Sequence, residues 1–282
     1  MIPRAVLACL LVLVVPLAAC GGSVDEAQGP AGQLPAVEPD PRCEAAPPEE
    51  LDLEVVRTLP HAQDAFTQGL EVVDGELFKS TGRVGESSVR VVDLDDGSEL
   101  RRVEVPDVFG EGLTADERGR IWQLTWTEGI AFVRDPQTLE ELERFEYDGE
   151  GWGLAALEDG RLVMSDGSDR LTVRDPGDFS VLEIWEVGRD AGPADRLNEL
   201  EWDGEHLWAN RYLTDELVRI DVDCRVVDAV VDLSELRAEA ASLAGGAAID
   251  VTNGVAHLPG TDRYLLTGKL WPVMFEVRLP ER

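Results

Sequence analysis

Residues 109–113, FGEGL, belong to a short motif that occurs five times along this chain. The other copies are FTQGL (66–70), EGWGL (150–154), LNEL (197–200) and NGV (253–255). Each copy is followed by a turn rich in glycine or aspartate, and each turn by a run of β-forming residues such as RIWQLTW at 120–126. A strand–turn–strand unit repeated about every 40 to 50 residues is the signature of a propeller.

The last repeat lacks one strand. Each of the first four repeats contains four β-rich runs, whereas the fifth contains three, and a spare run, LEVVRT at 53–58, precedes the first repeat. The sequence therefore predicts an all-β fold: a five-bladed β-propeller with four strands in each blade, closed by the N-terminal strand. One short helix is expected over 234–244, in the connection before the last blade, with Ser234 as its cap.

The N-terminal 50 residues are expected to lie outside the propeller. Arg4 precedes an apolar stretch too short to span a bilayer comfortably, and LAACGG at 17–22 fits a bacterial lipoprotein box, so 1–20 is predicted to be a signal peptide with Cys20 as the lipidated residue. An ordinary signal peptide with a chance cysteine is the alternative. The composition of 21–50 predicts a disordered tether, and 51–282 the folded domain. We thus expect an exported lipoprotein on the periplasmic or cell-surface face of a membrane, attached only through its lipid.

Two further cysteines, Cys43 and Cys224, are expected to form a disulfide that pins the tether to the domain, because an exported chain meets an oxidising environment. They are too far apart in sequence to indicate a metal site.

The formal net charge of −32 argues against nucleic acid and against an anionic membrane surface as partners. Most of these charges are expected to form a solvated surface. Lysine is rare in the chain: only Lys79 and Lys269 occur.

In a propeller the first strand of each blade lines the central channel. The repeat therefore predicts that five equivalent residues meet at one mouth of the channel: Gln68, Glu111, Trp152, Asn198 and Asn253. The second strands are expected to bring Trp126, Asn210 and Lys269 to the same mouth.

No stretch of the sequence matches a common catalytic or metal-binding motif. His61, His206 and His257 are scattered, so we expect them to be structural, and SDGSD at 165–169 is more typical of a turn than of a calcium site. One carboxylate among amides and aromatic rings suits a small polar ligand with an apolar face. Partial burial would raise the pKa of that carboxylate and let it shuttle a proton near neutral pH.

Taken in order, these motifs resemble those of the glutamine cyclotransferases of plant and bacterial type. The resemblance runs from about Leu59 to Val277 and rests on AFTQGL (65–70), STG (80–82), FGEGLT (109–114), LTW (124–126), EGWGL (150–154), SDGS (165–168), LNELE (197–201) and TGK (267–269). It implies a five-bladed propeller enzyme of the acyltransferase class, a glutaminyl-peptide cyclotransferase. Such an enzyme converts the N-terminal glutamine of a peptide or protein to pyroglutamate and releases ammonia.

The resemblance also implies roles for individual residues. Glu111 would be the proton shuttle, while Gln68, Asn198 and Lys269 would hold the substrate amide and its oxyanion. The residues implied to bind substrate and shape its pocket are Phe66, Phe109, Trp126, Trp152, Tyr212 and Asn253. No cofactor and no catalytic zinc is implied, and a monomer is expected.

The chain departs from the family pattern at three places: Tyr212 replaces a usual tryptophan, PHAQD at 60–64 differs from the usual Pro-His-Asp-Pro, and Cys224 replaces part of a turn. Two alternatives stay open, a non-catalytic propeller that binds peptide termini and a metal-dependent lactonase or sugar-acid hydrolase. The presence of both Glu111 and Lys269 favours the cyclotransferase over the first. A single carboxylate among the five equivalent positions argues against the second.

Overall fold

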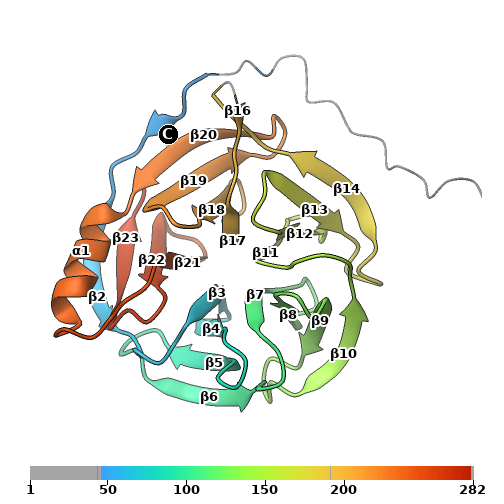
Figure 1. The fold of residues 1–282 in the computed structure, drawn as a ribbon, viewed down its shortest axis with the longest axis horizontal. Coiled ribbons are helices and arrows are strands. Elements are labelled where there is room, and N and C mark those ends of the chain that lie inside the picture. Colours follow the sequence, from blue (N-terminus) through green and yellow to red (C-terminus); the bar gives the residue numbers. More distant parts are fainter. Residues whose placement is uncertain (1–42, 44–45, 191, 281–282) are drawn as a thin grey trace, which may run out of the picture. The chain divides into compact units, whose positions relative to one another are not determined.

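Antiparallel β-strands make up most of the computed structural model, which describes residues 43, 46–190 and 192–280. Their sheets are arranged around a common centre, and the helix of the described part lies on the outside (Figure 1). The innermost strand of each sheet is the one that carries the repeated motif. These strands are β3 (Thr67–Val73), β7 (Gly110–Ala115), β11 (Leu154–Ala156), β17 (Leu197–Trp202) and β21 (Thr252–His257).

Four of the sheets have four strands. In three of these sheets the strands follow the order of the chain outward from the centre. The sheet of β3 adds β4 (Glu76–Thr81), β5 (Ser88–Asp93) and β6 (Glu99–Glu104), and the sheet of β7 adds β8 (Ile121–Thr125), β9 (Ile130–Arg134) and β10 (Glu141–Glu146). The sheet of β11 adds β12 (Leu162–Ser165), β13 (Arg170–Arg174) and β14 (Val181–Glu186). The fourth sheet has the order β2-β23-β22-β21 and adds β2 (Glu54–Pro60), β22 (Arg263–Gly268) and β23 (Val273–Arg278). Its outer pair, β2 and β23, is antiparallel.

The fifth sheet overturns the predicted architecture, because it has seven strands. Besides β17 it contains β18 (Leu207–Arg211), β19 (Glu216–Asp221), β20 (Val226–Asp232), β1 (Glu49–Glu50), β15 (Gly188–Arg189) and β16 (Gly192–Pro193). The prediction of five equal four-stranded blades closed by the N-terminal strand is therefore wrong. The fold is a propeller-like arrangement of four four-stranded blades and one larger sheet, and the first described strand, β1, belongs to that larger sheet.

The extra strands cover the outer edge of β20. Both β1 and β15 pair with it in parallel, at opposite ends: Glu50 lies opposite Val230, and Gly188 opposite Val226. An uncovered edge would leave a row of backbone N–H and C=O groups open to another chain. The added strands thus protect the sheet that departs from the repeat.

A disulfide joins Cys43 to Cys224, with 5.4 Å between the two Cα atoms. The pairing expected from the sequence is therefore present, and it fastens the segment that leads into β1 to the turn between β19 and β20. Cys20, the signal peptide and most of the tether lie outside the described residues, so lipid attachment and export stay predictions.

Glycines allow the innermost strands to pack backbone against backbone around the centre. A Cβ on Gly69 would lie 2.5 Å from the amide nitrogen of Leu113, and one on Gly112 would lie 2.6 Å from the carbonyl oxygen of Trp152. The amide of Gly112 also donates a 2.6 Å hydrogen bond to that same carbonyl. No side chain fits at these two positions, which explains why glycine recurs in the motif.

Pairs of aspartate and tryptophan fix the turns that follow two of the inner strands. Asp116 accepts a 3.0 Å bond from the indole of Trp122, and Asp203 accepts a 2.7 Å bond from that of Trp208. Trp122 then stacks between Phe145 and Phe179 in the core. The buried indole N–H groups of Trp122 and Trp208 thereby each have a partner, as is usual for a buried tryptophan.

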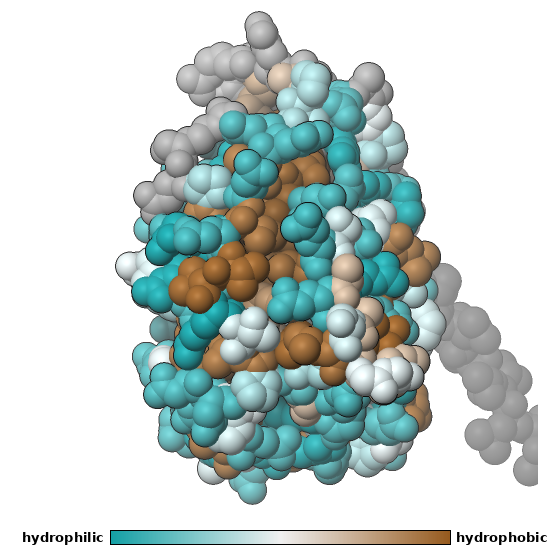
Figure 2. Space-filling model, turned by 90° about the vertical axis from the view of Figure 1, so that its left-hand side faces the viewer, coloured by the Kyte–Doolittle hydropathy of each residue, from teal (hydrophilic) through white to brown (hydrophobic). Residues whose placement is uncertain are grey.

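The expected helix is present as α1 (Ser234–Leu243), in the connection before β21. Ser234 is not its cap: the N-cap residue is Leu233, and the Ser234 amide donates to the carboxylate of Asp232 instead. Figure 2 shows an apolar strip between hydrophilic residues on the side of the molecule where α1 and β2 lie in Figure 1. Within the described residues, no helix is both long enough and apolar enough to cross a membrane.

Candidate active site

The repeated positions at the start of the innermost strands are joined by side-chain hydrogen bonds. Gln68 on β3 donates from Nε2 to Glu111 Oε1 on β7 at 2.9 Å. Asn253 on β21 donates from Nδ2 to Gln68 Oε1 at 3.3 Å and to the carbonyl of Thr67 at 3.0 Å. Three of the five equivalent residues therefore form one chain, Asn253–Gln68–Glu111.

This chain fixes how Glu111 is presented. Asn253 is fully buried and sits behind Gln68, so its observed role is to orient that amide, and its direct contact with a substrate stays a prediction. Asn198 is also buried, and its backbone carbonyl accepts a 2.6 Å bond from Ser165. The Asn198 side chain makes no hydrogen bond to another residue of the described part, which leaves its amide available to a ligand.

Glu111 and Lys269 are buried at the same mouth, each with about 5% of its surface exposed. Burial raises the pKa of Glu111 well above its usual range; the charge of Lys269 opposes this shift, and those of Glu128 and Glu150 add to it. Burial likewise lowers the pKa of Lys269, against the pull of Glu111 and Asp250. Burial therefore moves the two pKa values toward each other, a perturbation typical of functional sites.

Aromatic rings surround this pair. The ammonium of Lys269 lies 4.8 Å from the ring centre of Phe66 and 5.4 Å from that of Tyr212. Ring contacts then extend from Phe66 through Phe109 to Trp126, with centre-to-centre distances of 6.1 and 5.5 Å, and from Trp152 to Tyr212 at 5.3 Å. We call these five rings, Phe66, Phe109, Trp126, Trp152 and Tyr212, the aromatic wall.

The wall is open to solvent, unlike the core aromatics. Trp126 is 39% exposed and the other four rings are partly exposed. The structure thus brings the sequence-predicted aromatic residues together with Glu111 and Lys269. Tyr212 meets Trp152 edge-on, so the residue that departs from the family pattern still completes the wall.

Two residues at this mouth were missed by the sequence reasoning. Glu150 accepts hydrogen bonds from two tryptophans of the wall, and the guanidinium of Arg83 lies 4.3 Å from the ring centre of Phe66. Glu150 lies inside the EGWGL motif and could have been singled out there. Arg83 sits at a positive φ of 81° in an irregular loop and carries no sequence signal.

The other lysine and the histidines lie in structural settings. Lys79 is buried on β4 opposite Arg90 of β5. His61 is buried between the carbonyl of Trp271 and the hydroxyl of Thr67, and burial lowers its pKa well below the usual value. These contacts agree with the expectation that His61 is structural.

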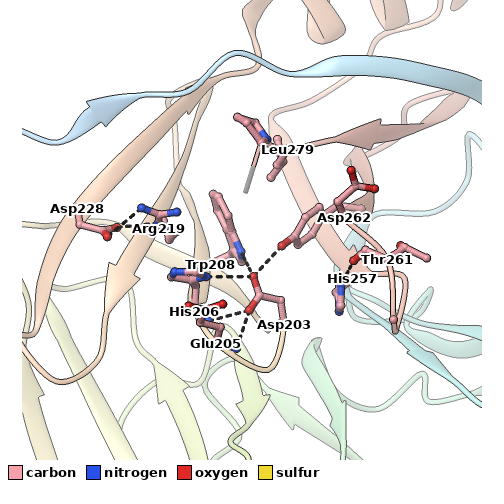
Figure 3. Close-up of a pocket in the computed structure, with 13 residues that line it drawn as sticks. Asp203, Glu205, His206, Trp208, Arg219, Asp228, His257, Thr261, Asp262 and Leu279 are labelled. Carbon is pink, nitrogen blue, oxygen red and sulfur yellow. Dashed lines mark hydrogen bonds and ion pairs between the residues drawn. The ribbon is translucent and has the colours of Figure 1, made fainter. Parts of the chain in front are cut away.

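A separate hollow of about 710 Å³ lies at the opposite end of β17, between the larger sheet and the sheet of β21 (Figure 3). Its polar groups are paired with one another: Asp203 accepts from Trp208 and Tyr264, Arg219 binds Asp228, and His257 contacts the carbonyl of Thr261. The hollow therefore offers no free catalytic group among these pairs. His206 and His257 both line it, and the structural role expected for His206 stays a prediction.

The SDGSD stretch has the hydrogen bonds of a turn. Asp166 Oδ1 accepts from both the amide and the hydroxyl of Ser168, and Gly167 has a φ of 81°. Among the described residues, no group of three or more His, Cys, Asp or Glu side chains is placed to hold a metal ion.

Three glutamates lie deeper between the inner strands. Glu199 accepts from the amides of Leu70 and Val255, and Glu201 from that of His257. Burial raises the pKa of Glu201 well above its usual value, and the neighbouring charges of Glu71, Glu199 and Asp203 add to the shift. Burial raises the pKa of Glu71 to about 7.

These raised pKa values make stability depend on pH. An acid that keeps its proton in the folded state stabilises the fold below its unfolded pKa of about 4.3, and this contribution is lost as pH rises through the folded pKa. We expect the free energy of unfolding to fall by on the order of 1–3 kcal/mol between about pH 4.3 and neutrality. Urea unfolding at several pH values measures this slope.

Glu201→Gln should flatten that slope, since its amide oxygen can still accept the His257 amide while the titrating group is gone. Glu205→Gln, at the exposed neighbouring turn, is the matched control and should leave the slope unchanged. A stability that rises from pH 4.5 to 7 would show that the cluster is ionised in the folded protein.

Comparison with known proteins adds an independent set of findings. The family model described as "Glutamine cyclotransferase" matches residues 31–279. The chain is 36% identical over 234 residues to a glutaminyl-peptide cyclotransferase of Arabidopsis thaliana, covering 82% of this chain and 72% of the relative.

Two solved structures are also similar to this chain. The crystal structure of Myxococcus xanthus glutaminyl cyclase superposes with a TM-score of 0.76 at 36% identity, covering 82% of this chain and 98% of that one. A PQQ-bound aldose sugar dehydrogenase from Streptomyces coelicolor has a TM-score of 0.52 at 13% identity, over 83% of this chain and 100% of that one, and shares the fold alone.

Proposed function

Because this chain belongs to the glutamine cyclotransferase family, we propose that it converts the N-terminal glutamine of peptides or proteins to pyroglutamate and releases ammonia. The proposal rests on one observation: Glu111 is buried, with a raised pKa, at the same mouth of the channel as Lys269, and the aromatic wall lies around them. The reaction is an acyl transfer, since the γ-acyl group of glutamine passes from its amide nitrogen to the α-amine.

The proposed reaction needs a proton to move between two nitrogens. The α-amine attacks the γ-carbonyl carbon, a new C–N bond forms, and the carbonyl oxygen takes up negative charge. Glu111 accepts the proton of the attacking nitrogen and delivers it to the departing one, after which the old C–N bond breaks and ammonia leaves. A single group whose pKa is raised above that of a free carboxyl can perform both transfers.

Other residues would hold the substrate. The free amide of Asn198 and the ammonium of Lys269 are suited to the developing oxyanion, and donors aimed at such charge are worth most in a water-poor site. Gln68 is fixed by Asn253 and in turn fixes Glu111. The aromatic wall would fold the glutamine side chain so that its amine faces its carbonyl, and such alignment is worth effective molarities on the order of 10⁵ M or more.

Purified full-length chain should release ammonia from a peptide with a free N-terminal glutamine, and it should not act on the same peptide with an acetylated N-terminus. A coupled ammonia assay and mass spectrometry of the peptide measure the two products. Turnover no faster than the spontaneous cyclisation would overturn the proposal, and binding of the peptide without turnover would support a non-catalytic propeller instead.

We also propose that the reaction needs no metal ion. Activity should then be unchanged, within about two-fold, after dialysis against EDTA and 1,10-phenanthroline at roughly millimolar concentration. Loss of activity that zinc or calcium restores would contradict this part of the proposal.

A further inference from the structure

One carboxylate oxygen holds both indoles of the aromatic wall. Glu150 Oε2 accepts a 2.7 Å hydrogen bond from Trp126 Nε1 and a 2.9 Å bond from Trp152 Nε1. Charge-assisted bonds of this kind are stronger than those between neutral groups. Two separate rings are thereby oriented by a single atom.

The two indoles come from different blades. Trp126 follows β8, whereas Trp152 precedes β11, and Glu150 lies in the connection between those two sheets. The backbone of this connection is itself anchored, because the amide of Gly151 donates a 3.0 Å bond to the carbonyl of Trp126. Gly151 also lies so close to the hydroxyl of Tyr147 that no Cβ would fit between them. The carboxylate is therefore held from a fixed segment.

Without Glu150 the indoles would have fewer restraints. Trp126 is 39% exposed, and its ring contact is to Phe109. Trp152 contacts Tyr212 edge-on. Neither indole N–H bonds to any other group of the described residues. Glu150 is thus the one hydrogen-bond partner, among the described residues, that fixes the indole N–H groups of both rings.

We propose that Glu150 is a positioning residue: it fixes Trp126 and Trp152 in the orientation that receives the N-terminal glutamine. The proposal rests on the proposed function for the identity of the substrate, and on the geometry alone for the clamp. Glu150 itself has no part in the transfer of a proton.

The charge of Glu150 has a second, separable effect. It helps to raise the pKa of Glu111, as does the charge of Glu128, while Lys269 opposes both. The charge of Glu111 also contributes to the raised pKa of Tyr147. Glu128 is exposed and accepts a 3.2 Å bond from the amide of Phe109, with no bond to either indole. It is therefore a matched control that separates charge from clamping.

Three variants, Glu150→Ala, Glu150→Gln and Glu128→Gln, test the clamp. Glu150→Ala should raise KM for a glutaminyl peptide by about 10-fold or more with a smaller change in kcat, since it removes the acceptor. Glu150→Gln keeps an oxygen acceptor and should restore KM to within about three-fold. In both Gln variants, the limb of the pH profile that is governed by the pKa of Glu111 should shift to lower pH. Only the changes at Glu150 should affect KM.

The second readout does not depend on activity. The indole N–H resonances of Trp126 and Trp152, assigned in ¹H–¹⁵N spectra with Trp126→Phe and Trp152→Phe, should shift in Glu150→Ala, shift less in Glu150→Gln, and stay in place in Glu128→Gln. Unmoved resonances in Glu150→Ala, or an equal rise of KM in Glu128→Gln, would overturn the clamp. Shifted resonances in a protein that never cyclises glutamine would support the clamp and refute the proposed function.

Discussion

Replacing Glu111 by glutamine is expected to lower kcat for cyclisation by about 10²–10⁴-fold, the contribution typical of general acid–base catalysis. The substituted amide can still accept the hydrogen bond from Gln68 through its oxygen, so the local structure should persist. What it cannot do is take a proton from the attacking amine and return it to the departing nitrogen. KM should change little, because the aromatic wall and Asn198 are untouched.

Single-turnover and steady-state rates of ammonia release measure this loss, together with the melting temperature of each variant. Glu117→Gln removes a carboxylate from the exposed turn at the far end of β7 and is the matched control; its kcat should equal that of the wild type. A Glu111→Gln variant that keeps its kcat within about three-fold, or that loses activity only because it unfolds, would remove Glu111 from the proposed mechanism.

The repeat in the sequence located the site more accurately than it described the fold. Gln68, Glu111 and Asn253 occupy equivalent places in three repeats, and the structure links their side chains directly. The reason is that backbone packing at glycine holds the innermost strands of a propeller in register. These glycines recur in the motif, so equivalent positions can be found from the sequence. The repeat also placed Lys269 at this mouth, and only its role toward the substrate depended on the family resemblance.

The errors concern features without a sequence pattern. The strands β1, β15 and β16 are two residues each, EE, GR and GP, and no β-propensity or alternation marks them. β1 and β15 pair with the edge of β20, and β16 pairs with β15, so these strands form only in the assembled sheet. Ser234 was expected to cap α1, yet it is the first residue of the helix, and its amide donates to the carboxylate of Asp232.

The clamp by Glu150 was missed for a related reason. An acid two residues before a tryptophan gives no hint that it also bonds a second tryptophan from the preceding blade. Only the folded connection between β10 and β11 brings Trp126 and Trp152 to the same oxygen. Contacts made by loops between repeats lie outside what the repeat itself can predict.

Replacing Gly153 by alanine is expected to destabilise the protein by about 3 kcal/mol or more, the range of overpacking in a site that cannot relax. Its Cβ would overlap the carbonyl oxygen of Asn198 and lie 2.8 Å from the Cα of Glu199, both backbone atoms of the next inner strand. That carbonyl is already bonded to the hydroxyl of Ser165, which in turn accepts the amide of Gly153. Relief would require β11 and β17 to separate.

For a domain of this size, such a loss should lower the melting temperature by about 6–12 °C. Gly192→Ala is the matched control: a Cβ there meets no atom within 4 Å, so its melting temperature should stay within about 2 °C of the wild type. Because Gly153 lies between Trp152 and the strand that carries Asn198, the same variant should also lose cyclisation at temperatures where it is still folded. If Gly153→Ala melted with the wild type, the inner strands could not be packed backbone against backbone, and the convergence of Gln68, Glu111 and Asn198 at one mouth would lose its structural basis.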